Sequence, residues 1–252
     1  HLVPHVEEAL LVHAHGLRHV VVDVAVAQVP EGHEAGTRQQ LRHRPVGLGT
    51  MAFSMEDVLL EPYGGQILHL SVGDTTKLTA ALAIGGLLGF GLASRILSRG
   101  YDPFRMALYG AQVGIPAFAA VILAAPLGSA WLFGVGTALI GFGAGLFGHG
   151  TLTATMNLAP RSQSGLALGA WGAVQASAAG VAIALGGVIR DVVAALSTQD
   201  EAGARLAYNS VYGLEIVLLL VTVGTMIPLL RRSGAGPVSP SNTCRVAELE
   251  AP

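Results

Sequence analysis

The chain has 252 residues, of which 52% are hydrophobic and only 12% are charged, and its formal net charge is −2. This composition excludes an ordinary soluble domain, in which about 25% of residues are charged, and no basic cluster of the kind that binds nucleic acid is present. A mean hydropathy of +0.57 and 34 glycines indicate a polytopic α-helical membrane protein, because small residues allow membrane helices to pack closely.

Residues 1–45 differ in composition from the rest of the chain and hold seven of its nine histidines. Their apolar stretch, residues 20–29, is too short to cross a membrane, which takes about 20 residues. One interpretation is a His-rich metal-binding tail, with His13, His15 and His19 as its best spacing. The other, which we favour, is a disordered or out-of-frame segment, because an off-frame read of a GC-rich gene is rich in Val, Ala, His and Arg.

Six apolar runs follow, and they define a membrane domain over residues 46–232. They lie at about residues 46–61, 78–97, 106–126, 130–152, 166–189 and 211–230. Residues 233–252 are rich in Ser and Pro and predict a disordered tail. The single cysteine, Cys244, lies in this tail, which excludes a disulfide framework and a Cys-based metal site.

The basic residues between the runs predict the orientation of the chain, because cytoplasmic loops are enriched in Lys and Arg. One side of the membrane collects Arg95, Arg99, Arg105, Arg161, Arg231 and Arg232. The other side collects Lys77, Arg190 and Arg205. We therefore expect the 98–105 loop and the C-terminus to lie in the cytoplasm.

Two stretches carry a resemblance to a known family. The first is DVLLEPYGGQIL (residues 57–68) followed by LSVGDTTKLTA (residues 70–80), and the second is RSQSGLALGAWG (residues 161–172). Both resemble the C-terminal half of the PucC/LhaA family, the bacteriochlorophyll-delivery branch of the major facilitator superfamily. The resemblance begins abruptly near residue 46 and implies an all-α, six-helix half of a twelve-helix membrane fold.

Three acids, Glu56, Asp57 and Glu61, interrupt the first apolar run. A carboxylate at the bilayer centre costs roughly 2.5–3.5 kcal/mol on insertion scales, so this cluster calls for an explanation. Three interpretations stay open: proton coupling in a polar cavity, contact with a pigment or partner, and a position at the membrane interface. The Pro62-Tyr63-Gly64-Gly65 sequence predicts a tight turn, with Tyr63 at the headgroup level.

The loop between the second and third runs is a second candidate. By its position it resembles the basic facilitator loop whose charges hold helix ends in one conformation. The matching residues are Arg95, Gly100, Asp102 and Arg105. The alternative interpretation is an ordinary cytoplasmic loop with the usual excess of positive charge.

Two residues of the later runs are candidates for contact with a pigment. His149 lies between two glycines in the fourth run, and a histidine in a span is a functional candidate by default. A neutral imidazole is a common axial ligand of bacteriochlorophyll magnesium, but a hydrogen bond to a neighbouring helix is the simpler interpretation. Trp171 offers a flat surface to a pigment or an antenna helix, or packs against its neighbours. The G-x-x-x-G spacings of Gly141 with Gly145 and of Gly165 with Gly169 predict close helix packing.

The resemblance implies a light-harvesting complex assembly factor that binds or delivers bacteriochlorophyll and contacts antenna polypeptides. The expected location is the bacterial inner (intracytoplasmic photosynthetic) membrane. The alternatives are a secondary transporter of a small solute, since fold does not imply function, and an inactive fragment. We expect no enzyme and no catalytic or metal-binding residues, because the sequence has neither an N-D-x-x-x-D type cluster nor a nucleophile–base pair.

Overall fold

The computed structural model describes residues 45–233, and the regular secondary structure of these residues is entirely helical, with no strand among them. Five helices within this range are long and apolar enough to cross a membrane. They are α4 (Val72–Leu97), α5 (Pro103–Ala124), α6 (Ala130–Leu158), α7 (Ser164–Leu196) and α8 (Glu201–Ser233). The predictions made for residues 1–44 and 234–252 lie outside the described residues.

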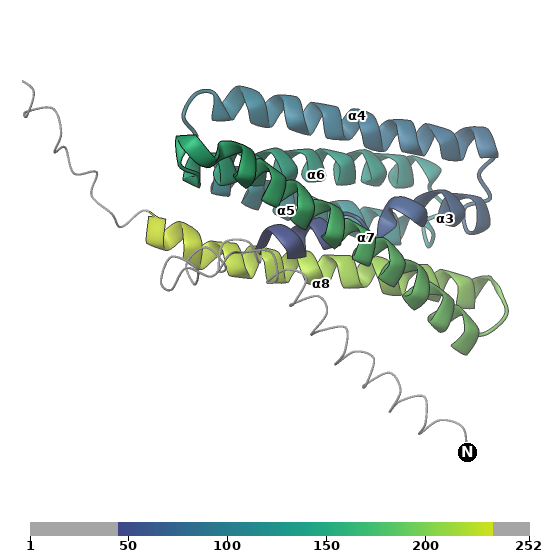
Figure 1. The fold of residues 1–252 in the computed structure, drawn as a ribbon. Coiled ribbons are helices and arrows are strands. Elements are labelled where there is room, and N and C mark those ends of the chain that lie inside the picture. The colour runs from purple at the N-terminus through teal and green to yellow at the C-terminus, as the bar shows by residue number, and fades with distance from the viewer. Residues whose placement is uncertain (1–44, 234–252) are drawn as a thin grey trace, which may run out of the picture.

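The helices form a layered bundle (Figure 1). The α6 helix packs against α4 on one side and α5 on the other, and α5 also packs against α8. The α7 helix lies against α8 and crosses the bundle at an angle (Figure 1). The short connections at residues 125–129 and 197–200 make α5 with α6 and α7 with α8 antiparallel neighbours, whereas the connection at residues 98–102 joins α4 to α5 across α6.

The first predicted span, residues 46–61, is not one continuous helix, and that prediction is wrong. Residues 45–52 are helical, and the chain then passes through a turn into the 3₁₀ helix η1 (Glu56–Val58) and the short helix α3 (Leu60–Gln66). We call residues 45–66 the broken segment.

The local hydrogen bonds account for the break. The Thr50 hydroxyl lies 2.8 Å from the Val46 carbonyl, and such back-bonding bends helices. The Phe53 N–H is shared between the Gly49 and Thr50 carbonyls, and the Ser54 N–H bonds to Met51, three residues back. The last turn therefore tightens, and the regular helix ends there.

The Pro62-Tyr63-Gly64-Gly65 sequence does not form the predicted tight turn. It lies inside α3, where Pro62 is in the first turn and needs no intrahelical N–H partner. The chain reverses later, at His69, which takes a positive φ of 53°. Tyr63 is fully buried instead of lying at the headgroup level, because its ring packs on Phe133.

Glycines bring α6 close to both neighbouring helices. A Cβ atom at Gly141 would overlap the Leu82 carbonyl of α4, and one at Gly145 would overlap the Gly86 carbonyl. The predicted close packing of this pair is confirmed. The Gly165 and Gly169 pair differs, since a Cβ at either position would meet no described atom within 4 Å.

The outward faces of α4 and α7 carry large exposed apolar side chains. Among them are Ile84, Leu87 and Leu88 of α4 and Leu166, Val188 and Leu196 of α7. Such surfaces are stable in hydrocarbon rather than in water, as expected of a membrane domain.

Candidate functional site

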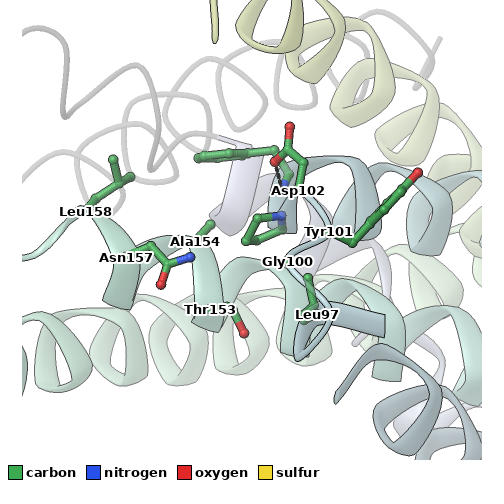
Figure 2. A pocket seen from close by; sticks show the side chains of 10 residues that line it. Leu97, Gly100, Tyr101, Asp102, Thr153, Ala154, Asn157 and Leu158 are labelled. Atoms are coloured by element: carbon green, nitrogen blue, oxygen red, sulfur yellow. Dashed lines mark hydrogen bonds between the residues drawn. The ribbon is translucent and has the colours of Figure 1, made fainter. Parts of the chain in front are cut away.

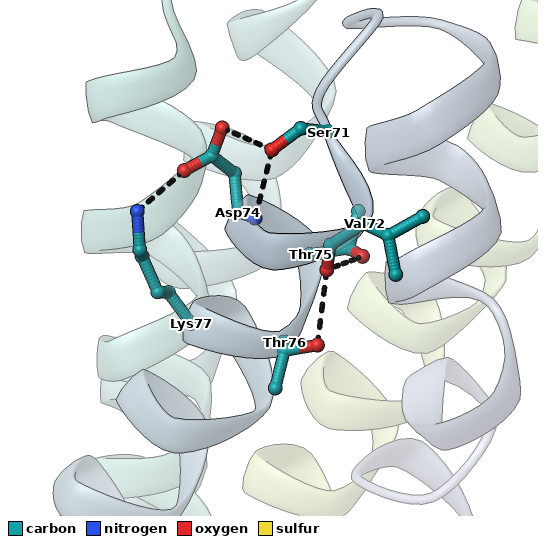
Figure 3. Close-up of polar contacts among 6 residues, drawn as sticks. All are labelled: Ser71, Val72, Asp74, Thr75, Thr76 and Lys77. Carbon is teal, nitrogen blue, oxygen red and sulfur yellow. Dashed lines mark hydrogen bonds and ion pairs between the residues drawn. The ribbon is translucent and has the colours of Figure 1, made fainter.

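The first residues of α4 form a network of polar contacts at one end of the bundle (Figure 3). Ser71 caps the helix by accepting a hydrogen bond from the Asp74 N–H at 3.2 Å. Its hydroxyl also donates to the Asp74 carboxylate at 2.7 Å, while Lys77 pairs with the other carboxylate oxygen at 2.6 Å. Asp74 and Lys77 therefore lie in the first turns of α4 and neutralise each other's charge.

The predicted acidic cluster does not come together in the structure. The break in the helix turns Glu56 into the core, where its residue is 1% exposed, while Asp57 and Glu61 are exposed. The Glu61 carboxylate accepts a hydrogen bond from the Thr79 hydroxyl of α4. The three acids thus occupy two different environments, one inside the bundle and one on its surface.

Glu56 has a partner that the sequence analysis missed. Glu215 of α8 is 0% exposed, and its carboxyl group interacts with that of Glu56. Within the described residues, one oxygen of Glu56 and both carboxyl oxygens of Glu215 lack a hydrogen bond of ordinary geometry. A signal was present in the sequence, because Glu215 is the one acid in the predicted 211–230 span.

An aromatic cluster adjoins this carboxyl pair through Tyr212, which interacts electrostatically with both carboxyl groups. The Tyr63 ring contacts the rings of Tyr208 and Tyr212 edge-on, at centroid distances of 5.3 and 5.4 Å. The hydroxyl groups of Tyr63 and Tyr212 are buried and have no hydrogen-bond partner among the described residues. The Tyr208 hydroxyl donates to Gln66 at 2.9 Å.

A contact from α7 holds the other side of the broken segment. The Thr50 hydroxyl lies 2.5 Å from the side-chain oxygen of Gln175. Gln175 of α7 therefore bonds across helices to the broken segment. Gly186 of the same helix packs directly on Met55, at the break.

The candidate conformational loop connects α4 to α5. Gly100 takes a φ of 85°, which favours glycine, and Asp102 caps α5 by accepting from the Phe104 N–H at 2.9 Å. Arg105 lies 3.9 Å from the Asp102 carboxylate, whereas Arg95 is exposed on the last turn of α4. The structure therefore joins Asp102 to Arg105 and leaves Arg95 apart.

This loop borders a cavity of about 420 Å³ at the C-terminal end of α6 (Figure 2). Its lining combines apolar side chains with the polar groups of Asp102, Thr153 and Asn157. The cavity lies at the end of the bundle that the sequence predicts to be cytoplasmic.

His149 and Trp171 belong to two different helix contacts: His149 of α6 meets α4, and Trp171 of α7 meets α6. The His149 ring meets the Phe90 ring of α4 edge-on at 4.1 Å, and its buried Nδ1 has no hydrogen-bond partner among the described residues. The Trp171 indole N–H donates to the Thr151 hydroxyl at 3.3 Å, which links α7 to α6. Both side chains are half-buried.

The fold and the site together define a polytopic α-helical membrane protein with a buried carboxyl pair at a helix break. A model of the family described as "PUCC protein" matches residues 28–234, so the chain belongs to this family. That match begins upstream of residue 46, where the resemblance read from the sequence begins.

Named relatives agree with this assignment. The chain is 55% identical over 186 residues to "Protein PucC" of Cereibacter sphaeroides, which covers 74% of this chain and 40% of that protein. It is 65% identical over 148 residues to "Protein PucC" of Rhodovulum sulfidophilum, covering 59% of this chain and 33% of that protein.

A more distant relative carries a different name. The "Bacteriochlorophyll synthase 44.5 kDa chain" of Rhodobacter capsulatus is 30% identical over 199 residues, covering 76% of this chain and 44% of that protein. The chain thus spans less than half the length of each of these relatives. No solved structure matches it.

Proposed function

We propose that this chain takes part in the assembly of light-harvesting complexes in the photosynthetic membrane. The observation that carries the proposal is the 55% identity to a PucC protein over 186 residues. The exposed apolar faces of α4 and α7 support it, because they suit lateral contact with lipid, pigment or another membrane helix. Antenna polypeptides are the partners that this function requires.

We further propose that the domain is a six-helix half of a major-facilitator-type fold. The broken segment then counts as the first crossing and the five long helices as the others. Discontinuous helices that expose backbone groups inside the bundle are common in folds built from such repeats, which supports the assignment. The conformational role of Arg95, Gly100, Asp102 and Arg105 stays part of this proposal.

Bacteriochlorophyll is the ligand that this function suggests, and His149 is the residue that we propose to contact it. Its imidazole lies between α4 and α6 beside Phe90, and nearly half of the Phe90 surface is exposed, at 47%. A flat apolar ring system would be able to lie against both side chains. Trp171, Asp57 and Glu61 are secondary candidates for contact with pigment or partner.

The pigment proposal is tested by co-purification of the full chain from pigmented membranes. The His149→Leu variant is expected to lose bound pigment, because leucine keeps the apolar volume and removes the ligating nitrogen. His69→Leu is the control, since its side chain is 74% exposed at a loop. Pigment retained by His149→Leu at the wild-type level would contradict ligation.

A secondary transporter is the second candidate function, and the buried pair of Glu56 with Glu215 favours it. Carboxyl groups inside a membrane domain mark ion or proton pathways in many transporters. We do not propose an enzyme, because the sequence lacks the clustered aspartates that a prenyl-transfer reaction needs to hold a magnesium diphosphate.

The first experiment is near-infrared absorption of membranes from a photosynthetic host in which this gene is deleted. The expected result is loss of the antenna bands while pigment synthesis continues, with recovery when an intact copy is supplied. Unchanged antenna bands would contradict the assembly role and would favour the secondary-transporter function instead.

A further inference from the structure

The carboxyl pair of Glu56 and Glu215 is the feature of the domain that the proposed assembly function does not use. Glu56 comes from the 3₁₀ turn of the broken segment and Glu215 from the middle of α8, so the pair bridges elements 159 positions apart in the sequence by their residue numbers. Glu56 is 1% exposed and Glu215 is 0% exposed. Two acids in contact inside an apolar core are costly unless a cation or a proton accompanies them.

Within the described residues, no basic side chain interacts with either carboxyl group. The other titratable groups that interact with the pair are Asp57 from η1 and Tyr212 from α8, while Tyr63 from α3 and Tyr208 from α8 interact with Tyr212. Within the part of the chain that the structure describes, no ion pair involves either carboxylate. Two carboxylates in contact cannot both ionise in such a place.

The buried oxygens also show unused hydrogen-bonding capacity. Both oxygens of Glu215 and one of Glu56 lack a partner of ordinary geometry among the described residues, and so does the hydroxyl of Tyr212. That hydroxyl interacts electrostatically with both carboxyl groups. An unpartnered carboxylate accepts hydrogen bonds only, whereas a protonated carboxyl donates one to its neighbour.

We propose that Glu56 and Glu215 form a proton-binding site inside the membrane domain, in which the two carboxyl groups share a proton at neutral pH. The proton lies on one carboxyl and is donated as a hydrogen bond to the carboxylate of the other, a charge-assisted bond of the strong class. The Tyr212 hydroxyl interacts electrostatically with both carboxyl groups but makes no hydrogen bond to either of them.

A proton fits this site better than a metal ion does. The described residues contain no group of three or more His, Cys, Asp or Glu side chains able to hold a metal. Gly186 of α7 packs directly on Met55, the residue before Glu56, and Tyr212, which interacts with both carboxyl groups, packs edge-on against Tyr63. A proton needs only the two carboxyl groups, while a metal ion needs several further oxygen ligands.

The break in the helix makes the site responsive to its own charge. The backbone N–H of Glu56 faces the Glu215 carboxyl, because the 3₁₀ turn frees it from a regular helical bond. Loss of the shared proton would leave two buried anions in contact and push the broken segment away from α8. Proton binding thereby holds the two elements together, whether or not the chain assembles antenna complexes.

The test is infrared spectroscopy of the purified full chain in detergent at neutral pH. We expect a C=O stretching band of a protonated carboxyl in apolar surroundings, which shifts in D₂O. Glu56→Gln and Glu215→Gln are each expected to reduce or shift this band. Glu61→Gln, a change at an exposed acid of the same segment, is the control and should leave it unchanged.

Three results would overturn the proposal. They are the absence of such a band in the wild-type chain, its persistence unchanged in both glutamine variants, and its replacement by a carboxylate band when Na⁺ is added at constant pH. If the variants do not fold, labelling of the wild-type chain with an apolar carbodiimide decides the question. Modification at Glu56 or Glu215 that declines as the pH rises is then expected, and modification confined to other carboxyls would refute it.

Discussion

Tyr63 lies at the centre of an aromatic cluster that joins the broken segment to α6 and α8. Its ring meets Phe133 at a centroid distance of 5.3 Å and Tyr208 and Tyr212 at similar distances. The side chain is 0% exposed, and its hydroxyl has no hydrogen-bond partner among the described residues. The ring stabilises the fold by packing, while burial of the hydroxyl costs free energy because no hydrogen bond replaces those that it makes with water.

Substitutions at Tyr63 separate these two contributions. Tyr63→Phe is expected to change the free energy of unfolding by less than about 1 kcal/mol, and in the stabilising direction, since an unsatisfied group is removed. Tyr63→Ala is expected to cost about 3–5 kcal/mol through the cavity that it leaves. The measurement is unfolding of the purified chain in detergent.

Tyr208→Phe is the matched comparison for the hydroxyl. It removes a hydrogen bond to Gln66, made at 2.9 Å, and should destabilise by about 0.5–1.5 kcal/mol. If Tyr63→Phe destabilised the chain more than Tyr208→Phe does, the Tyr63 hydroxyl would have a partner after all.

At the scale of single elements, five of the six predicted spans correspond to the long helices. The predicted 78–97 and 211–230 runs begin later than α4 and α8 do, because hydropathy does not register capping residues such as Ser71 or the polar first turns. The first span was predicted wrongly for a different reason. The hydrogen bond from the Thr50 hydroxyl to the Val46 carbonyl and the Phe53 N–H that is shared between two carbonyls end the helix there. Neither feature can be detected from the hydropathy of the sequence.

The carboxyl pair illustrates what a sequence leaves open at this scale. Glu56 was found because it interrupts an apolar run, but its partner lies on a helix far along the chain. Only the packing of α8 on the broken segment determines that Glu215, rather than the nearby Asp57 and Glu61, meets it. Close glycine packing was predictable at Gly141, where the spacing falls on a helix–helix contact, and failed at Gly169, where α7 faces outward.

The packing of α6 on α4 gives an element-scale prediction. Gly141→Ala is expected to destabilise the chain by about 1–3 kcal/mol, because the added Cβ would overlap the Leu82 carbonyl, which is backbone and cannot rotate away. Gly169→Ala is the control, since its Cβ would meet no described atom within 4 Å; a gain of about 0.5–1 kcal/mol is expected from the higher helix propensity of alanine. Thermal unfolding in detergent measures both, and equal effects would contradict the close α4–α6 contact.

The start of α8 gives a prediction of pH dependence. Asp200 accepts hydrogen bonds from the Thr198 hydroxyl and the Gly203 N–H, and these bonds hold the pKa of its carboxyl below the ordinary value of 3.8. A lowered pKa means that the charged form stabilises the fold above that value and that this contribution is lost as the pH falls through the folded-state pKa.

Asp200→Ala should therefore lower the melting temperature at neutral pH, and the difference from wild type should shrink in strong acid. Asp200→Asn keeps an oxygen acceptor at the cap without the charge, so it should remain closer to wild type and show little pH dependence of its own. A difference between Asp200→Ala and wild type that is constant with pH would contradict the ionic part of the cap.

At the scale of the whole molecule, the two least buried of the described long helices, α4 and α7, carry large apolar side chains on their outer faces. Leu87 of α4 is 74% exposed and Leu166 of α7 is 68% exposed, although the helices containing them have the length and hydropathy of membrane spans. Within a bilayer such faces meet lipid or another membrane element without cost. The relatives are more than twice as long as the region that matches this chain.

The orientation of the domain is a prediction from charge, and it can be tested with the single cysteine. The excess of arginines in the 98–105 loop and at residues 231 and 232 predicts a cytoplasmic position for that side by the positive-inside rule. Cys244 follows residues 231 and 232 in the sequence, so the prediction is that its thiol reacts with a membrane-impermeant maleimide only in inverted vesicles. The Cys244→Ser variant has no cysteine, so it is the control that shows whether the label is attached to Cys244.

This experiment also tests whether the number of crossings is even. If α5, α6, α7 and α8 all cross, four crossings separate the 98–105 loop from the C-terminus, and the two lie on the same side of the membrane. A cysteine placed at Ser98 in a Cys244→Ser background should therefore be labelled in the same vesicles as Cys244. Labelling of the two positions from opposite sides would mean that an odd number of these four helices crosses, and labelling of Cys244 in right-side-out cells would contradict the predicted orientation.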